Sequence, residues 1–270
     1  MPITLSASDP TPDLRPFRVI SLGWGVQSFT LAAMSALGEL DPVDAAIHAD
    51  TTHEASGTYA FAREWMLWME ELGVSVVTVK SGNPVIDIIR TGGMIYIPAF
   101  TRSLRKRDGM LRRQCTNRWK IQPIRRWLQA NRAGKPVEMW MGITTDEASR
   151  MRDSDVKYIR NIYPLIDKGM SRHDCVKWLQ AHILPVPPKS ACVFCPFHDT
   201  RAWRDLKKMS GNGDWKKAIE VDEQIRKVRP PYELFLHPSR IPLEDVDIST
   251  AEERGQLNLW NNECAGVCGV

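Results

Sequence analysis

The chain has 270 residues, of which 43% are hydrophobic, and a net charge of +4. This is sufficient for one good-sized α/β core with appended elements, whereas no apolar run approaches the roughly 20 residues of a membrane-spanning helix. Residues 1–16 are rich in Pro, Ser, Thr and Asp and lack the features of an export signal. We therefore expect a flexible leader, no membrane association and a cytoplasmic protein whose cysteines act as ligands or catalysts.

Hydrophobic runs alternate with helical periodicity along residues 17–156. Strands are predicted at residues 17–22, 43–49, 74–79 and 137–143, and helices at residues 28–37, 59–72 and 117–131. Strands that are separated by helices form parallel sheets. The expected fold class is therefore α/β, with an open, mainly parallel sheet that carries helices on both faces.

Beyond residue 156 the pattern becomes shorter and more helical. Helices are predicted at residues 171–181 and 214–228, joined by proline-rich links. We therefore expect an α/β domain over residues 17–156 and a small helical, cysteine-bearing region over residues 157–270 that packs on it.

A glycine turn follows the first predicted strand, in the segment Ser-Leu-Gly-Trp-Gly-Val-Gln-Ser of residues 21–28. Gly23 and Gly25 allow backbone amides to approach an anion closely, and the helix that Ser28 is expected to open carries partial positive charge at its amino end. The turn matches neither the Walker pattern nor the dinucleotide fingerprint. It predicts a phosphate site, with an ordinary strand–turn–helix connection as the alternative.

Acidic and polar residues follow two other predicted strands. Asp50 and Glu54 come after the second strand, and Asp146 and Glu147 come after the strand at residues 137–143. Ligands of open α/β sheets bind at the carboxyl ends of the strands. We therefore expect these carboxylates to line a ligand site together with the glycine turn.

Six cysteines are the chain's strongest chemical signal. Cys192 and Cys195 have the C-x-x-C spacing of a metal or cluster half-site, Cys115 lies upstream, and Cys264 and Cys268 lie near the end of the chain. Single thiolates around one C-x-x-C favour an iron–sulfur cluster, while zinc and a redox dithiol remain open. The sixth cysteine, Cys175, is predicted to be a small buried residue of a helix.

Basic residues are dense between residues 102 and 126, where Asp108 is the only acid. A block of like charge repels itself unless an anion neutralises it. This favours a phosphate-rich partner, with a solvated face as the alternative, and residues 101–114 are expected to form a mobile loop. The predicted contacts are Arg105, Lys106, Arg107, Arg112, Arg113, Arg118 and Lys120.

These segments together resemble the PP-loop adenine-nucleotide α-hydrolase superfamily, in its branch of PAPS-reductase-like proteins. Residues 21–28 are similar to its Ser-Gly-Gly-x-Asp-Ser loop, residues 48–54 to its Asp-Thr-Gly-x-x-Glu motif, and residues 142–150 to its Gly-x-Arg-x-x-Glu-Ser-x-x-Arg motif. Residues 114–123 resemble the Cys-Cys-x-x-Arg-Lys-x-x-Pro motif of cluster-bearing adenylylsulfate reductases. The chain departs from the family at Gln27, where the loop usually has Asp, and at Gln114, where reductases have a first cysteine.

The resemblance implies ATP and Mg²⁺ as ligands and a [4Fe–4S] cluster as cofactor. The implied nucleotide-binding residues are Ser21, Gly23, Gly25, Gln27, Ser28, Asp50, Glu54 and Arg150. The implied catalytic residues are Asp146, Glu147 and Cys264. The implied cluster ligands are Cys115, Cys192, Cys195 and Cys268, with Cys264 as the alternative fourth ligand.

The function implied in first place is that of an ATP pyrophosphatase that activates a nucleic-acid group for sulfur insertion, as in DNA phosphorothioate modification (the DndC and SspD type). Its partners would be DNA or tRNA and a sulfur donor such as a cysteine desulfurase. Reduction of adenylylsulfate or PAPS is the alternative, although the reductases' tail is matched only by Glu263-Cys264 with no histidine after it. A tRNA thiolation enzyme and a non-catalytic nucleic-acid binder with a cluster or zinc are further alternatives.

Overall fold

The computed structural model describes residues 15–82, 95–103, 107–209, 211, 213–250 and 253. The chain forms two compact units, the first from residues 1–87 and 113–192 and the second from residues 88–112 and 193–270. This division differs from the predicted boundary after residue 156, because elements between residues 157 and 192 pack in the first unit. Within the described ranges, no helix is both long and apolar enough to cross a membrane.

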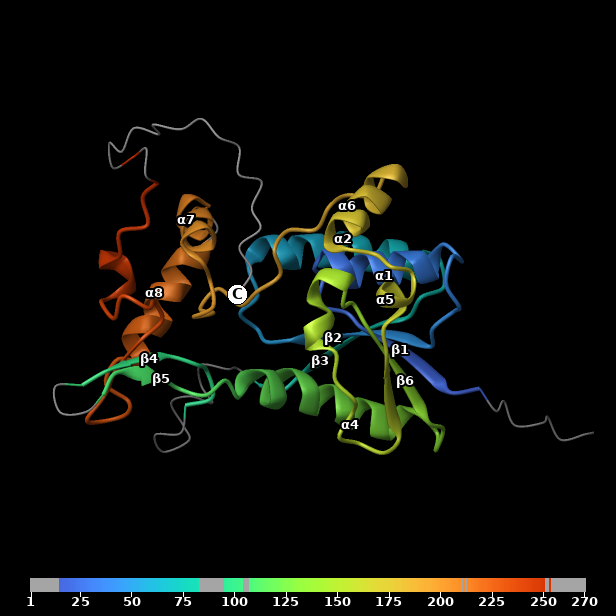
Figure 1. Ribbon diagram of the computed structural model, residues 1–270, viewed down its shortest axis with the longest axis horizontal. Helices are drawn as coiled ribbons and strands as arrows, with labels where there is room; N and C mark the ends of the chain where they lie inside the picture. Colours follow the sequence, from blue (N-terminus) through green and yellow to red (C-terminus); the bar gives the residue numbers. More distant parts are fainter. Residues whose placement is uncertain are drawn as a thin grey trace, which may run out of the picture. The chain divides into compact units, whose positions relative to one another are not determined.

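The first unit contains a five-stranded sheet in the order β3-β2-β1-β6-β7. Strands β1, β2, β3 and β6 are labelled in Figure 1. All four neighbouring pairs are parallel, which confirms the predicted fold class. The sequence patterns missed β7 because it has only four residues and occupies an edge of the sheet. The strands are β1 Phe17–Ser21, β2 Ala45–Asp50, β3 Val76–Lys80, β6 Val137–Met141 and β7 Ile159–Ile162.

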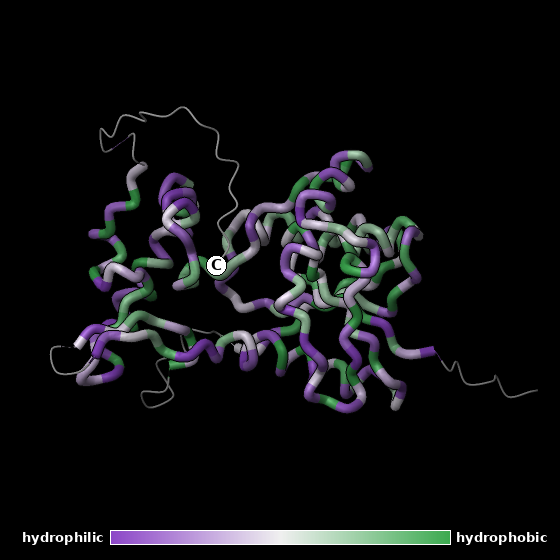
Figure 2. The backbone as a smooth tube through the Cα atoms, viewed as in Figure 1, coloured by the Kyte–Doolittle hydropathy of each residue, from purple (hydrophilic) through white to green (hydrophobic). Residues whose placement is uncertain are grey.

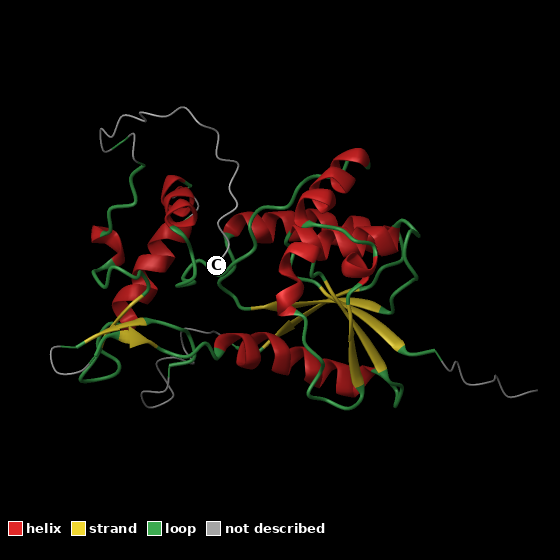
Figure 3. Cartoon of the chain, in the orientation of Figure 1, coloured by secondary structure: helices red, strands yellow, loops and turns green. Residues whose placement is uncertain are grey.

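Helices cover both faces of this sheet, as predicted (Figure 3). Residues of four helices share a core with Ile20 and Trp140 on one face, whereas Ile124 and Leu128 of α4 pack with Val19 on the other. Successive strand residues point to opposite faces, which is why neighbours such as Val19 and Ile20 belong to different cores. The four helices are α1 Val26–Ala36, α2 Ser56–Glu71, α5 Pro164–Asp167 and α6 Arg172–Ala181, and the opposite helix is the π-helical turn η1 Thr116–Ile121 continued by α4 Gln122–Asn131.

The backbone of the first unit contains many stretches of hydrophobic residues among hydrophilic ones (Figure 2). Phe29 of α1 meets Phe61 and Trp65 of α2 edge to face, with ring centroids 4.9 and 5.6 Å apart. Cys175 of α6 is fully buried in the same core, and burial raises the pKa of its thiol to about 11. This confirms the prediction that Cys175 is a packing residue.

The order of the strands contains a topological switch between β1 and β6. From β1 the chain adds β2 and then β3 on one side, and it later adds β6 and β7 on the other side. In open α/β sheets the crevice outside the carboxyl ends of the strands at such a switch is the usual ligand site. The ligand site is therefore expected at the segments that follow Ser21 and Met141.

The second unit contains a three-stranded antiparallel sheet in the order β5-β4-β8. The prediction of a mobile loop over residues 101–114 is wrong where β4 and β5 lie. Strand β4 pairs with β5 and with β8. Because β8 lies more than 130 residues further along the chain, no local pattern reveals this pairing. Arg105 and Lys106 lie outside the described residues. The elements are β4 Phe100–Arg102, β5 Gly109–Met110, α7 Thr200–Lys208, α8 Asp214–Ile225, β8 Glu233–Phe235 and the short η4 Leu243–Asp245.

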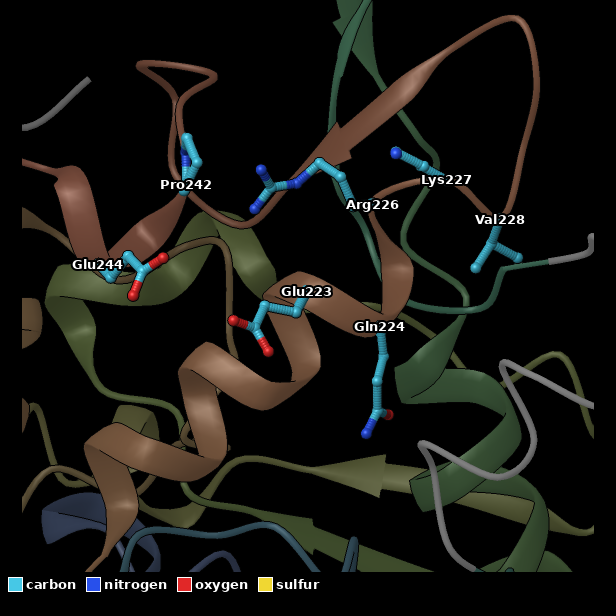
Figure 4. Close-up of a pocket in the computed structure, with 7 residues that line it drawn as sticks. All are labelled: Glu223, Gln224, Arg226, Lys227, Val228, Pro242 and Glu244. Carbon is cyan, nitrogen blue, oxygen red and sulfur yellow. The ribbon is translucent and has the colours of Figure 1, made fainter.

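Asp222 of α8 holds this second unit together. It is 1% exposed, accepts the backbone N–H groups of Leu236 and Leu243 at 2.8 and 3.0 Å, and pairs with Arg226. Beside this network, Glu223 and Arg226 help to line an open pocket of about 600 Å³ (Figure 4). No residue of this pocket was predicted to have a function, and the contacts of Asp222 indicate a structural role.

Candidate functional site

The loop between β1 and α1 is held in place by its own side chains. Trp24 is buried, adopts a left-handed φ of 57°, and packs edge to face on His48 and Phe61. The Ser28 hydroxyl accepts the N–H of Gly23 at 3.1 Å and donates to the carbonyl of Gly25 at 3.2 Å. The helix begins at Val26, two residues earlier than predicted, so Ser28 lies in its first turn and braces the loop from inside.

The end of β6 lies directly against this loop. A Cβ atom at Gly142 would lie 2.7 Å from the backbone nitrogen of Ser28 and 2.8 Å from its Cα, closer than real atoms approach. Only a glycine allows this approach of two backbones. The segment after β6 continues the contact, because Gln27 donates to Glu147 at 3.4 Å. The predicted phosphate loop and the predicted acidic segment therefore meet at the topological switch.

The two acidic residues of the short helix η2 Thr145–Arg150 have different partners. Glu147 pairs with Arg150 at 2.6 Å and faces the phosphate loop through Gln27. Asp146 accepts the backbone N–H of Arg172, the first residue of α6, at 3.0 Å. Burial would raise the pKa of Asp146, but the N–H of Arg172 and other hydrogen bonds hold it below its usual value. Asp146 thus anchors α6, whereas Glu147 lies against the loop.

Asp50, at the end of β2, is 6% exposed and has three hydrogen-bond donors. The Tyr59 hydroxyl donates to it at 2.6 Å, the Thr52 N–H at 2.7 Å and the Lys80 ammonium at 3.0 Å. Burial alone would raise the pKa of this carboxyl, but these donors together lower it. Asp50 therefore stays charged and fixes the segment that follows β2.

Replacing Tyr59 by phenylalanine is expected to destabilise the first unit in a pH-dependent way. A carboxyl with a lowered pKa in the folded state contributes stability above its unfolded pKa of about 3.9, and this contribution is lost as the pH falls through the folded pKa. The lost hydrogen bond to a charged group should cost about 1.5–3 kcal/mol at pH 7. Urea unfolding at pH 7, 5 and 3 should show a difference from the native chain that shrinks below pH 4.

Tyr158→Phe is the matched control, because the Tyr158 ring lies 4.3 Å from the Arg132 guanidinium and its hydroxyl donates to no carboxylate of the described residues. A Tyr59→Phe difference of equal size at pH 3 and pH 7 would contradict the role of Asp50.

Glu54 forms a buried network with Lys120 and Cys192. It is 3% exposed, and its Oε1 accepts from the Lys120 ammonium at 3.0 Å and from the Thr51 hydroxyl at 3.3 Å. The Cys192 Sγ lies 3.1 Å from the Thr51 hydroxyl and 3.8 Å from Glu54 Oε1. Oε2 of Glu54 is buried without a hydrogen-bond partner in the described part of the chain. Glu54, predicted to bind a cofactor, therefore joins the end of β2 to the cysteine segment.

Two of the predicted cluster ligands lie around the same ammonium. Burial would lower the pKa of Lys120, but Glu54, Cys192 and Cys115 raise it above the usual value. Cys115 and Cys192 are half-buried, and two thiols beside one ammonium fit the chemistry of cluster ligands. Cys195 belongs to the second unit, and Cys264 and Cys268 lie outside the described residues. Among the residues that are described, no three His, Cys, Asp or Glu side chains gather as a metal site.

The predicted nucleic-acid contacts divide into two groups. Arg107, Arg112 and Arg113 are exposed, whereas Arg118 and Lys120 are half-buried. Lys120 is engaged by Glu54, so its first role in the structure is to neutralise a buried carboxylate.

Two contacts of the phosphate loop were not foreseen from the sequence. Gly142 was quoted only as the start of a motif, and its steric role appears only with the neighbouring backbone in place. Ser190 donates its hydroxyl to the carbonyl of Gly23 and lies beside Gly25, with 3.7 Å between its Cβ and a Cβ built on that glycine. No local pattern marks Ser190, because its partner lies 167 residues away.

No protein-family model matches the chain, and no curated protein matches it. Among solved structures, the fold is similar to that of phosphoadenylyl-sulfate (PAPS) reductase from Candida auris, determined as a phosphate complex. The TM-score is 0.46 at 14% sequence identity, over 64% of this chain and 76% of the reductase.

Proposed function

We propose that this chain binds ATP at the switch between β1 and β6 and transfers the adenylyl group to an oxygen of a nucleic acid. The activated group would then accept sulfur, as in DNA phosphorothioate modification. One observation carries the nucleotide site: the glycine loop and the segment after β6 are in backbone contact at Gly142 and Ser28, and Gln27 reaches Glu147. A triphosphate that bridges both segments would meet the amino end of α1, which favours anions.

The proposed transfer of the adenylyl group involves no oxidation or reduction at the nucleotide. The acceptor oxygen attacks the α-phosphorus of ATP, the bond to the bridging oxygen breaks, and pyrophosphate leaves with the electron pair. The terminal sulfur of a donor protein's persulfide then displaces AMP, and a thiol cleaves the resulting disulfide. Arg150, whose side chain is 63% exposed beside Glu147, is the proposed cation for the leaving pyrophosphate.

Mg²⁺ would enter with the nucleotide and use few protein ligands, as it commonly does in phosphoryl-transfer sites. Asp50 and Asp146 already accept hydrogen bonds from the protein. Glu147 is the carboxylate next to the phosphate loop, and its own partners, Gln27 and Arg150, are residues proposed to act at the phosphates. Gln27 can also supply an amide oxygen. Glu147 and Gln27 are the proposed ligands of the Mg²⁺ that the phosphates bind.

A [4Fe–4S] cluster is proposed on Cys115, Cys192, Cys195 and one of Cys264 and Cys268. The support is that Cys115 and Cys192 are half-buried and share a neighbour, Lys120, whose pKa both thiols raise. When bound, such a cluster would supply electrons or bind and transfer sulfur near the end of β2. Lys120 would offset part of the negative charge of its thiolates.

Reduction of adenylylsulfate or PAPS is the second candidate function. Its support is the position of Lys120, an ammonium between Glu54 and two half-buried thiols, which suits a sulfate group. In that reaction the Cys264 thiolate would attack the sulfate sulfur and release an adenine nucleotide. A dithiol reductant would then attack the Cys264 sulfur, release sulfite and be oxidised to its disulfide.

Product analysis separates the two functions. Under the first, [γ-³²P]ATP should release pyrophosphate when DNA or tRNA is added, and adenylylsulfate should release no sulfite. Arg150→Ala should slow pyrophosphate release by about 10²–10³-fold, the usual effect of removing one group that stabilises developing charge. Arg160→Ala is the control, because Arg160 is an exposed arginine of β7 in the same unit. Sulfite release without pyrophosphate release would establish the second function instead.

A further inference from the structure

The sheet of the first unit borders a cavity of about 610 Å³ on the face that α4 covers. Alternate residues of a strand share a face. The sheet side of the cavity is accordingly formed by Ser21 of β1, Met139 and Met141 of β6, and Ile159 and Asn161 of β7. Polar Ser21 and Asn161 stand near the carboxyl ends of their strands, so the cavity begins at the same edge as the phosphate loop.

The walls of this cavity combine an apolar floor with a basic rim. Ile124, Met139, Ile143 and Ile159 are buried and form much of the floor. The rim carries four arginines and two aspartates: Arg113, Arg125, Arg150, Arg152, Asp153 and Asp155. An apolar surface below an excess of arginines suits a flat base that carries phosphates, since bases stack on apolar and guanidinium surfaces while arginines bind phosphate.

The rim is already ordered by hydrogen bonds. The Tyr163 hydroxyl accepts the N–H of Arg152 at 2.9 Å and donates to its carbonyl at 2.6 Å, and the Asn161 amide donates to the same carbonyl at 2.8 Å. Arg125 pairs with Asp155 across the rim. A site whose walls are held in this way loses little entropy when a ligand binds.

We propose that this cavity receives one nucleotide unit of the acceptor nucleic acid, with its base on the apolar floor and its phosphates on the arginine rim. The inference rests on the proposed function, because it gives the acceptor strand a place beside the ATP site. Arg150 belongs to both sites, since it lines the cavity and pairs with Glu147 beside the phosphate loop, so a phosphate of the bound unit would lie close to the α-phosphorus.

The position of the cavity indicates that its occupant is a nucleic-acid strand and not the adenine base of ATP. The helix α1, whose amino end would hold the triphosphate, packs on one face of the sheet, whereas the floor residues Ile124, Met139 and Ile159 belong to the core of the opposite face. Arg113 and Arg125 also belong to the basic segment that the sequence predicts to contact nucleic acid. A strand can use this run of charge, whereas a free nucleotide needs only a few cations.

Two substitutions test the cavity without changing the phosphate loop. Ile121→Trp fills the floor from a position that is 36% exposed, and Arg152→Ala removes a cation from the rim at an exposed position. Arg160→Ala is the charge-matched control outside the cavity. The ligands are 12-residue single strands of DNA and of RNA with one 2-aminopurine, whose fluorescence rises when the base leaves its stack, and a fluorescent ATP analogue measured in parallel.

Ile121→Trp should weaken binding of one or both strands by at least about tenfold, the contribution of one stacked base. Arg152→Ala should weaken it by a similar factor, because it removes a charge-assisted hydrogen bond to a phosphate. They should also abolish the 2-aminopurine signal and leave ATP affinity within twofold. The strand, DNA or RNA, that gives the larger rise in 2-aminopurine fluorescence with the native protein is the source of the bound nucleotide unit. Unchanged strand binding in both variants would overturn the inference, as would a parallel loss of ATP affinity, which would assign the cavity to adenine. Native protein that binds ATP but no strand would also overturn it and leave the ATP site intact, whereas strand binding without ATP binding would refute the proposed function alone.

Discussion

Replacement of Gly142 by alanine is expected to remove most of the affinity for ATP. The new Cβ would lie 2.7 Å from the nitrogen of Ser28, and both neighbours are backbone atoms that cannot rotate away. Overpacking of this kind typically costs about 1–3 kcal/mol. If the first turn of α1 shifts to relieve the clash, the phosphate site is distorted. A loss of this size in the free energy of ATP binding corresponds to an increase of about 5–150-fold in Kd. Titration with a fluorescent ATP analogue measures it.

The control for this substitution is Gly57→Ala in α2, where the added Cβ meets only Pro188 at 3.8 Å. Alanine is the better helix former, by up to about 1 kcal/mol, so this variant should fold at least as well as the native chain. It should bind ATP with native affinity. Native ATP affinity in Gly142→Ala, with circular dichroism showing a folded chain, would place the phosphate site away from the first turn of α1.

Replacement of Cys192 by serine is expected to abolish iron binding. A [4Fe–4S] cluster needs four thiolates, and anaerobically purified protein should carry about four irons and four sulfides per chain. Serine keeps the size of the side chain near Thr51 and Glu54 but removes the sulfur ligand. Iron and sulfide analysis, together with the brown absorption of the native protein, measures the loss.

Cys175→Ser is the matched control, because Cys175 is fully buried in the core against α1 and its thiol has a raised pKa. That variant should lose some stability but keep its iron. Stoichiometric zinc in place of iron in the native protein would contradict the cluster and favour the zinc alternative. Iron retained in Cys192→Ser would remove Cys192 from the set of ligands.

Most of the first unit's sheet could be predicted from the sequence. β1, β2, β3 and β6 are runs of apolar residues between helical segments, and buried parallel strands produce this local signal. β7 was missed because four residues at a sheet edge produce almost none. The strands β4 and β5 were missed because their pairing depends on β8, far along the chain, and a mobile loop was expected in their place.

The segments that are proposed to carry the chemistry could also be picked out from the sequence. The glycine turn, the carboxylates after β2 and β6 and the C-x-x-C pair are each readable over fewer than ten residues, because each is a local pattern of backbone and side-chain types. Only the tertiary structure decided how they combine: Gly142 against Ser28, Glu54 with Lys120 and Cys192, and a cavity with an apolar floor below an arginine rim. The first two sets of contacts join residues more than 60 positions apart, and the cavity gathers residues of β1, α4, β6 and β7. All three therefore depend on the register of the strands and the packing of α4, which no local pattern contains.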